Sequence, residues 1–426
     1  MAAPGPRQTH LAASCVLATV CLAGAGDGAR WMQWHGPSAD NVSSETGLLK
    51  TWPEGGPKLL WTATNCGVGF SSVTISDGLI ITAGDFPDGT RVIALDADGK
   101  DVWRASNGSR MWRHPKKKEW ANKHAGSRAT PVIDDGRVFH MNAVGRLAAY
   151  KLANGTRAWT VDLRQRFGGV CNEWGYSESV LVRNRRVYCV PGGKNGYMVA
   201  LDAKTGETAW ANKTIKDKAS NSHIVRVEIE GVGQLVTMTT VLVVGVREED
   251  GELLWSIRHA NRFRENCEAP RLVDGIIYVS SGYRHGSEGL KVTKNETGKF
   301  SCRQVWRNSA ADNLHGGPII LDGHVYATGY DRKGFFCLDL QTGREKWRNR
   351  AIGRTSFTSA EGLLYCLGED GTVRLVEPSP EKYIELGKFR LPSAGKGICL
   401  AHMVICGKRL YVRHGTKLYC YDIARK

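Results

Sequence analysis

Ionisable side chains stand at the entry to successive apolar segments of this 426-residue chain. Glu178 precedes SVLVR, His223 precedes IVRVEI and His402 precedes MVIC. Burying such groups without partners is costly, so their recurrence at these positions indicates a shared site. Imidazole, carboxyl and guanidinium groups could bind an anionic small molecule or a sugar, or act as general acid and base. The candidate ligand-binding residues are Arg128, Trp174, Glu178, His223, Glu268, His315 and His402.

The same residues also have a structural interpretation. Arg128 and Glu178 could form an ion pair that holds strands together, and His315, before two glycines, could cap a turn. His402 could be a hydrogen-bonded core histidine. Histidine and carboxylate are suitable metal ligands, but no spacing motif joins them here, so we predict no metal site. Catalytic residues are not assigned, because the nucleophile-elbow, P-loop, Rossmann and zincin motifs are all absent.

A repeat in the chain indicates how these residues are positioned. Glycine is followed four residues later by tryptophan in five places, each time after a segment typical of a strand. Self-similarity at intervals of about 40 to 55 residues predicts stacked supersecondary units. The copies are Gly99–Trp103, Gly155–Trp159, Gly206–Trp210, Gly251–Trp255 and Gly343–Trp347, with a stretched copy from Gly298 to Trp306.

Each repeat unit has short, β-branched, alternating runs separated by Gly, Asn and Asp turns, as in Ser177–Trp210. This pattern is typical of a four-stranded antiparallel meander. We therefore predict an all-β fold, an eight-bladed β-propeller, in which each tryptophan fills the space between neighbouring sheets. These tryptophans are expected to be structural.

The two ends of the chain complete one blade in this prediction. The eighth unit stops after KLYCYDIARK, where its tryptophan strand should come, and a matching strand, GPKLLW, ends at Trp61. The N-terminal strand is therefore expected to close the last blade, which removes free sheet edges. The predicted boundaries are a signal peptide at 1–25, an N-terminal extension at 26–56 and the propeller at 57–426.

In such a ring the connections between blades arrive at one face, where the inner strands begin. The two longest connections are Arg104–Ala125, which is basic and aromatic at Lys116–Lys118 and Trp120, and Thr160–Tyr176. Long loops on a rigid repeat scaffold tend to carry function. We expect a polar, aromatic-lined pocket at this channel mouth.

The N-terminal segment and the composition indicate where the protein is located and which partners it could bind. The apolar segment Leu11–Ala25 follows Arg7 and ends in small residues, which is typical of a secretory signal and predicts a periplasmic or secreted protein. The net charge of +16 suits an acidic partner or a solvated basic surface, but no nucleic-acid motif accompanies it. No segment of the mature chain is apolar enough to span a membrane. Several cysteines, such as Cys189 and Cys337, lie in strand runs and are expected to be buried thiols.

The segments Ala200–Trp210 and Cys337–Trp347 resemble the tryptophan-docking motif of pyrroloquinoline-quinone (PQQ) propellers. Over nearly its whole mature length the chain is similar to the exported PQQ-like β-propeller repeat proteins of bacteria, which also share Trp31–Pro37 and Thr46–Pro57. The resemblance implies PQQ with calcium as a candidate cofactor. The chain lacks the adjacent cysteine pair of the quinoprotein dehydrogenases and any aspartate that matches their base, so this cofactor is not favoured. Glu178, Asn313 and Trp174 are the nearest substitutes.

Three functions follow from these observations. The first is an exported, monomeric binding module that recognises a small molecule, a polysaccharide or an envelope protein at the channel mouth. The second is a PQQ-dependent alcohol or sugar dehydrogenase that uses the same face. The third is an envelope-assembly scaffold similar to the outer-membrane assembly propellers.

Overall fold

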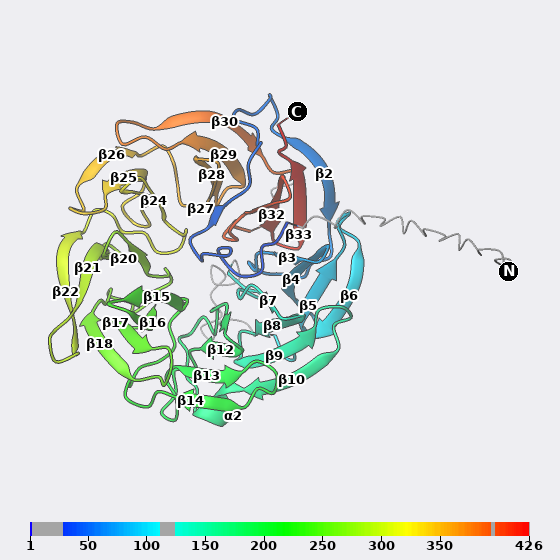
Figure 1. Cartoon of the computed structure of the whole chain (residues 1–426). Coiled ribbons are helices and arrows are strands. Elements are labelled where there is room, and N and C mark those ends of the chain that lie inside the picture. Colours follow the sequence, from blue (N-terminus) through cyan, green and yellow to red (C-terminus); the bar gives the residue numbers. More distant parts are fainter. Residues whose placement is uncertain (2–28, 111–123, 393–396, 426) are drawn as a thin grey trace.

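In the computed structural model the chain forms a closed ring of eight β-sheets around one axis (Figure 1). The structure describes Met1 and residues 29–110, 124–392 and 397–425. The predicted signal peptide and the basic stretch Lys116–Lys118 with Trp120 lie outside these residues. The eight-bladed, four-stranded antiparallel propeller predicted from the repeat is confirmed.

Each blade is a meander whose strands run in chain order from the axis to the rim. Blades one to four are β3–β6 (Thr74–Ser76, Leu79–Phe86, Gly89–Leu95, Asp101–Ser106), β7–β10 (Val132–Asp134, Arg137–Met141, Arg146–Lys151, Arg157–Asp162), β11–β14 (Leu181–Arg183, Arg186–Cys189, Val199–Asp202, Thr208–Ala211) and β15–β18 (Val225–Ile229, Val232–Met238, Leu242–Arg247, Leu253–Arg258). Blades five to seven are β19–β22 (Arg271–Val273, Ile276–Ser281, Gly286–Lys294, Phe300–Asn308), β23–β26 (Ile319–Leu321, His324–Thr328, Phe335–Asp339, Glu345–Asn349) and β27–β30 (Thr355–Ala360, Leu363–Gly368, Thr372–Glu377, Ile384–Arg390).

The eighth blade joins the two ends of the chain, as predicted. Strands β31 (Val404–Cys406), β32 (Arg409–His414) and β33 (Lys417–Asp422) come from the C-terminal end. Strand β2 (Lys58–Ala63) supplies the outer strand, with Leu59 opposite Tyr421 and Trp61 opposite Cys420. Ring closure therefore pairs the strand edges that an open array would expose.

The tryptophans dock each blade onto the next. The indole Nε1 of Trp159 donates to the carbonyl of Ala203, 3.0 Å away, and the indole face covers Gly206. Glycine is required here for two reasons. A Cβ on Gly206 would lie only 2.8 Å from that ring, and Gly206 has φ of 75°, a conformation that other residues rarely adopt. Similar pairs of a tryptophan and the glycine of the next blade are Trp61 and Gly99, Trp103 and Gly155, Trp210 and Gly251, and Trp306 and Gly343.

The junction between blades four and five departs from this pattern. Nε1 of Trp255 donates to Oε1 of Gln234 in its own blade, 2.7 Å away. Its expected partner in blade five, Gly298, lies in the stretched repeat, and a Cβ there would meet only the side chain of Lys294. Trp255 still packs with Ile277 and Leu290 of blade five, but without the docking hydrogen bond.

Two elements were not expected from the repeat. A one-turn helix, α2 (Leu163–Phe167), lies between blades two and three, with Asp162 accepting at its N-cap and Gly168 in the left-handed region at its end. The short strand β1 (Val42–Ser43) pairs in parallel with β27 and makes blade seven five-stranded. The described residues before β2 therefore pass beside β27 near the axis and then reach the outer strand β30 at the rim, where Trp52 packs on Phe389 (Figure 1).

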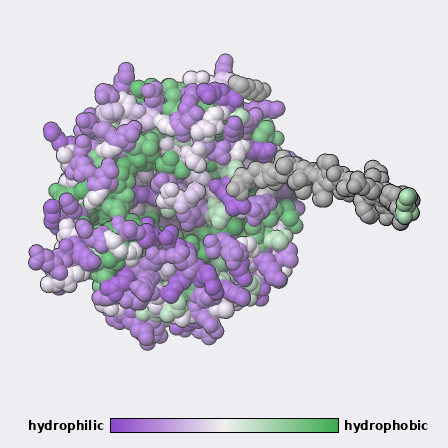
Figure 2. Space-filling view, viewed as in Figure 1, coloured by the Kyte–Doolittle hydropathy of each residue, from purple (hydrophilic) through white to green (hydrophobic). Residues whose placement is uncertain are grey.

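The core consists of apolar clusters between adjacent sheets. The surface is mostly hydrophilic in one view, with apolar patches between (Figure 2). Among the described residues the cysteines are free thiols, and Cys189, Cys337, Cys366 and Cys420 are buried, as expected. No helix in the described ranges is long and apolar enough to cross a membrane.

Candidate functional site at the channel mouth

A cavity of about 500 Å³ lies where the connections between blades converge, and we call it the channel-mouth cavity. Its walls come from every connection that leads to an inner strand except the one between β26 and β27, from the N-terminal segment, and from the turns between β20 and β21 and between β24 and β25. The aromatic residues in its lining are Trp34, Phe70, Trp174, Phe263, Tyr283 and Tyr330.

The fold brings most of the predicted site residues together in this cavity. Those that line it are Arg128, Trp174, His223, Glu268, His315 and His402. Glu178 lies outside the lining, in the wall, where it is buried and its Oε2 accepts a hydrogen bond from the amide of Val190 at 2.8 Å. The register of the inner strands explains the difference, because Glu178 is one residue further along its connection than the lining residue Ser177.

Arg128 supplies a cation to the cavity. Its guanidinium donates to the carbonyl oxygens of Trp174, at 2.9 Å, and His124, and lies 6.0 Å from the centre of the Trp174 ring. Burial lowers the pKa of Arg128 to about 10, so the side chain remains charged at neutral pH.

Trp174 is held by a residue that the sequence did not single out. Its indole Nε1 donates to Oε1 of Glu265, 2.7 Å away, and the hydroxyl of Tyr283 donates to the other oxygen at 2.5 Å. Glu265 thus joins Trp174, on the connection between β10 and β11, to Tyr283, in the turn between β20 and β21. Glu268, three residues later, was the predicted residue because it stands nearer the strand.

The N-terminal extension inserts Trp34 and His35 into the middle of the site. The Trp34 ring stacks on His223, with centroids 3.7 Å apart and planes 9° from parallel. Nε2 of His35 lies 3.1 Å from Nδ1 of His402, and Nδ1 of His35 contacts the guanidinium of Arg271. Neither Trp34 nor His35 was a candidate, because residues 26–56 have no counterpart in the repeat. The tryptophan–histidine pair in Trp31–Pro37 was the available signal.

Burial sets the charge of the site. Desolvation lowers the pKa of His223 and His402 to about 3 and that of His315 to about 4, so these imidazoles are neutral. Desolvation raises the pKa of Glu178 to about 8 and that of Glu268 to about 7. Near pH 7 the imidazoles are therefore neutral, the Glu268 carboxyl is partly protonated and Arg128 contributes a cation. Glu173 and Glu265 also line the cavity.

The matching family model is described as outer membrane protein assembly factor BamB and covers residues 88–349 and 286–379, more than half of the chain. The chain belongs to this family. The expected resemblance to bacterial PQQ-like propellers is thereby confirmed. Two curated relatives are similar. The outer membrane protein assembly factor BamB of Shewanella oneidensis is 23% identical over 271 residues, which are 59% of this chain and 64% of that protein. The BamB of Moranella endobia is 21% identical over 279 residues, again 59% and 64%.

Solved structures share the fold. BamB from Moraxella catarrhalis is 14% identical with a TM-score of 0.61, covering 86% of this chain and 99% of that one. Quinohemoprotein alcohol dehydrogenase from Comamonas testosteroni is 13% identical with a TM-score of 0.63, covering 93% and 81%. At these identities the likeness shows the architecture alone.

The residues present do not fit a quinone held by calcium. Calcium takes six to eight oxygen ligands, which would have to converge at the cavity. Glu178 is bonded to Val190 in the wall, and Asn313 donates its amide to the carbonyl of Thr328, 2.8 Å away. Of the three substitutes named from the sequence, Trp174 lines the cavity, but Glu178 and Asn313, which would have to supply oxygen ligands, do not.

Proposed function

We propose that this protein is an exported β-propeller that binds a small ligand in the channel-mouth cavity. The observation that carries the proposal is the convergence of aromatic and polar side chains from seven inter-blade connections and the N-terminal segment on one cavity. Its volume of about 500 Å³ lies in the range typical of small-molecule sites, which are mostly apolar with a few placed polar groups.

The lining favours a compact ring with an acidic substituent. Trp174, Tyr283 and Phe263 offer flat apolar faces, on which a sugar or aromatic ring can stack. Neutral imidazoles such as His315 can donate or accept a hydrogen bond without repelling an anion. The Arg128 guanidinium is positively charged and can form a charge-assisted hydrogen bond with a carboxylate. A uronic acid, which combines a sugar ring, hydroxyl groups and a carboxylate, would match this lining.

The test is calorimetric titration of the purified full chain with glucuronate and galacturonate, with glucose as the uncharged control. We expect saturable binding of an acidic sugar that Arg128→Ala weakens at least about tenfold, since a charge-assisted hydrogen bond is lost. Arg137→Ala is the matched control, because Arg137 lies at the opposite end of an inner strand pair, beside the exposed Asp135. Equal weakening by both variants, or no binding of any sugar by the folded protein, would refute the proposal. A parallel titration with PQQ and Ca²⁺ tests the dehydrogenase alternative.

A second function, binding of an envelope protein, is favoured by the BamB family and by the rim of the same face. Val68, Val170 and Phe263 are 45%, 43% and 55% exposed, and all three lie on connections that lead to inner strands. Apolar side chains exposed around one opening suit a protein contact. Partner capture from envelope extracts should fail for Phe263→Glu and persist for Val102→Glu, which alters a 48% exposed residue on outer strand β6. Capture unchanged by Phe263→Glu would remove this function.

Both functions place the protein outside the cytoplasm. Support comes from the signal-like segment Leu11–Ala25, which lies outside the described residues, and from relatives named as outer membrane assembly factors. When the full-length chain is expressed, cell fractionation should recover it from the periplasm or the medium, cleaved at or near residue 25. Recovery of an uncleaved cytoplasmic chain would contradict export.

A further inference from the structure

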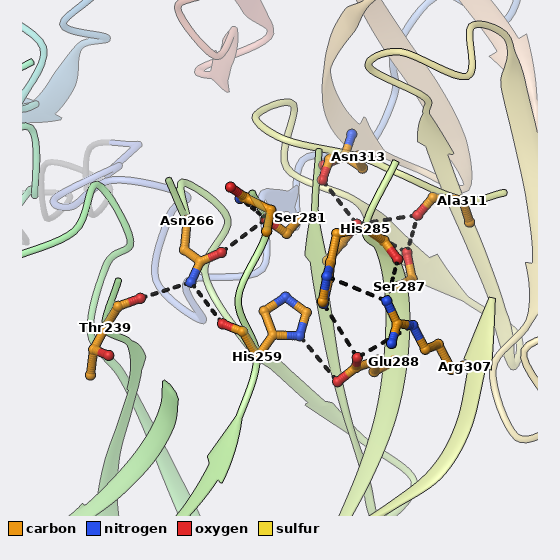
Figure 3. A network of polar contacts seen from close by, with 12 residues as sticks. Thr239, His259, Asn266, Ser281, His285, Ser287, Glu288, Arg307, Ala311 and Asn313 are labelled. Carbon is orange, nitrogen blue, oxygen red and sulfur yellow. Dashed lines mark hydrogen bonds and ion pairs between the residues drawn. The ribbon is translucent and has the colours of Figure 1, made fainter. Parts of the chain in front are cut away.

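A cluster of His259, His285 and Glu288 lies apart from the channel-mouth cavity, at the junction of blades four and five (Figure 3). His259 directly follows β18, the outer strand of blade four. Glu288 lies on β21 of blade five, and His285 lies in the turn before that strand. The three side chains thus come from two sheets and meet at their boundary.

Both imidazoles face the same carboxylate. Nδ1 of His259 lies 3.1 Å from Oε2 of Glu288, and Nε2 of His285 lies 3.4 Å from Oε1. The two rings are perpendicular, with centroids 4.5 Å apart. The side chains of His259, His285 and Glu288 are 0%, 11% and 3% exposed, so the cluster is nearly closed to water.

These separations suit a transition-metal ion. With metal–nitrogen and metal–oxygen bonds of about 2.0–2.1 Å, ligands at tetrahedral angles lie about 3.3 Å from one another. In the described part of the chain this is the one group of three or more His, Cys, Asp or Glu residues whose ligand atoms all lie within 4.8 Å of each other. Two histidines and one carboxylate form a ligand set that Zn²⁺ uses.

Hydrogen bonds alone leave the cluster incomplete. Nε2 of His259 is buried and has no hydrogen-bond partner among the described residues. Nε2 of His285 forms no aligned hydrogen bond there, although it lies 3.4 Å from Oε1 of Glu288. Buried polar atoms are normally paired, so an imidazole nitrogen at this distance from a carboxylate can instead bind a cation.

Neighbouring hydrogen bonds hold the ligands in place. Asn266 donates its amide to the carbonyl of Thr239 at 2.7 Å and to that of His259 at 3.3 Å, and its oxygen accepts from Ser281. Ser287, next to Glu288, donates to the carbonyl of Ala311. Ligands fixed in this way need little rearrangement to bind an ion.

Arg307 is the one feature that opposes a cation. Its Nε lies 3.7 Å from Oε1 of Glu288, and its side chain is 45% exposed. The half-exposed guanidinium also donates to the carbonyl of His285 at 3.0 Å, and it competes with an ion for the same carboxylate.

We propose that His259, His285 and Glu288 bind a divalent transition-metal ion, with Zn²⁺ the best match, and that the ion fastens blade four to blade five. An independent observation supports the location. This junction is where Trp255 forms its hydrogen bond within its own blade instead of docking onto a glycine of the next. The metal would supply there the cross-blade connection that the tryptophan supplies between Trp159 and Ala203.

The test uses the purified full chain after removal of metal with a chelator. Zn²⁺ is added in competition with a chromophoric indicator, and Co²⁺ is added separately to record the visible absorption of a nitrogen- and oxygen-ligated ion. We expect about one ion per chain, with affinity lowered at least about tenfold by His285→Ala and by Glu288→Gln. His315→Ala, which removes a histidine on the channel-mouth cavity, is the matched control and should bind the ion as the unaltered chain does.

The exposed Arg307 provides a second variant that leaves the buried ligands intact. Arg307→Gln removes the competing cation and should tighten Zn²⁺ binding about three- to tenfold. Zinc should also raise the melting temperature of the unaltered chain but not that of His285→Ala. Absence of saturable binding at one ion per chain, unchanged affinity in Arg307→Gln, or binding in His285→Ala equal to that of the unaltered chain would each overturn the proposal.

Discussion

Nε2 of His35 lies 3.1 Å from Nδ1 of His402, although 367 positions separate the two residues in the chain. His35 belongs to the segment before the propeller strands, and His402 stands at the entry to the last blade. The contact therefore joins an early and a late segment of the chain at the axis, in addition to the pairing of β2 with β33 at the rim.

His35→Ala should destabilise the fold by about 1–3 kcal/mol, because it removes the partner of a buried guanidinium and of a partly buried imidazole. The groups affected are Arg271, which is buried, and His402, which is partly buried, and both contact His35. Urea unfolding measures the change in the free energy of unfolding, provided that its dependence on urea concentration (the m-value) is the same in both proteins. His324→Ala, at the start of β24, should change stability by less than about 0.5 kcal/mol. Equal losses in the two variants would mean that the axial contact is energetically unimportant.

The buried histidines should make the fold sensitive to acid. His223 and His402 have pKa values of about 3 in the folded chain because burial disfavours their charged form, whereas an unfolded histidine has an ordinary value of 6.5. Above pH 6.5 both states are neutral and stability is at its full value. As the pH falls from 6.5 toward 3, only the unfolded state takes up protons, and each histidine costs about 2 kcal/mol over the first two pH units.

The measurement is the free energy of unfolding between pH 7 and pH 4.5 in the unaltered chain and in His402→Asn. The variant has one buried imidazole fewer, so its stability should fall less steeply over this range. Parallel curves for the two proteins would show that His402 titrates normally when folded.

Glu178 should produce the opposite dependence. Burial raises its pKa to about 8 in the folded chain, from an ordinary value of 4.5. Between these values the unfolded state loses a proton that the folded state keeps, so stability is full below pH 4.5 and declines as the pH rises through 8. Glu178→Gln is neutral at every pH and its oxygen can still accept from the amide of Val190. The variant should exceed the unaltered chain at pH 8 by at least about 2 kcal/mol relative to their difference at pH 5. Chemical denaturation at both pH values gives this comparison, and a difference that does not change with pH would contradict it.

The propeller and the entry positions of its inner strands were predictable, because every blade repeats the same turn and tryptophan. The repeat places a residue such as His223 or His315 at the channel mouth whatever the details of packing. Three features required the folded structure. Trp34 and His35 lie outside the repeat, Glu265 stands three residues before the predicted entry residue Glu268, and the His259–His285–Glu288 cluster combines two blades. The register between adjacent blades decides such contacts, and no short sequence pattern encodes it.

The glycines of the repeat give a direct test of the docking between blades. A Cβ on Gly206 would lie 2.8 Å from the ring of Trp159, and the residue has φ of 75°. Gly136 has φ of 66° in the turn between β7 and β8, but a Cβ there would meet nothing within 4 Å. Both substitutions to alanine impose the cost of a left-handed conformation, roughly 1 kcal/mol, and only Gly206→Ala also forces the indole away from its carbonyl partner on Ala203. Gly206→Ala should therefore lose about 1–3 kcal/mol more stability than Gly136→Ala.

Thermal unfolding of the two variants measures the difference. The tryptophan fluorescence should shift in Gly206→Ala alone, since only there does an indole change its surroundings. Similar melting temperatures would show that the sheets can separate slightly at no cost, and that the packing of aliphatic side chains, rather than the docked indole, holds neighbouring blades together.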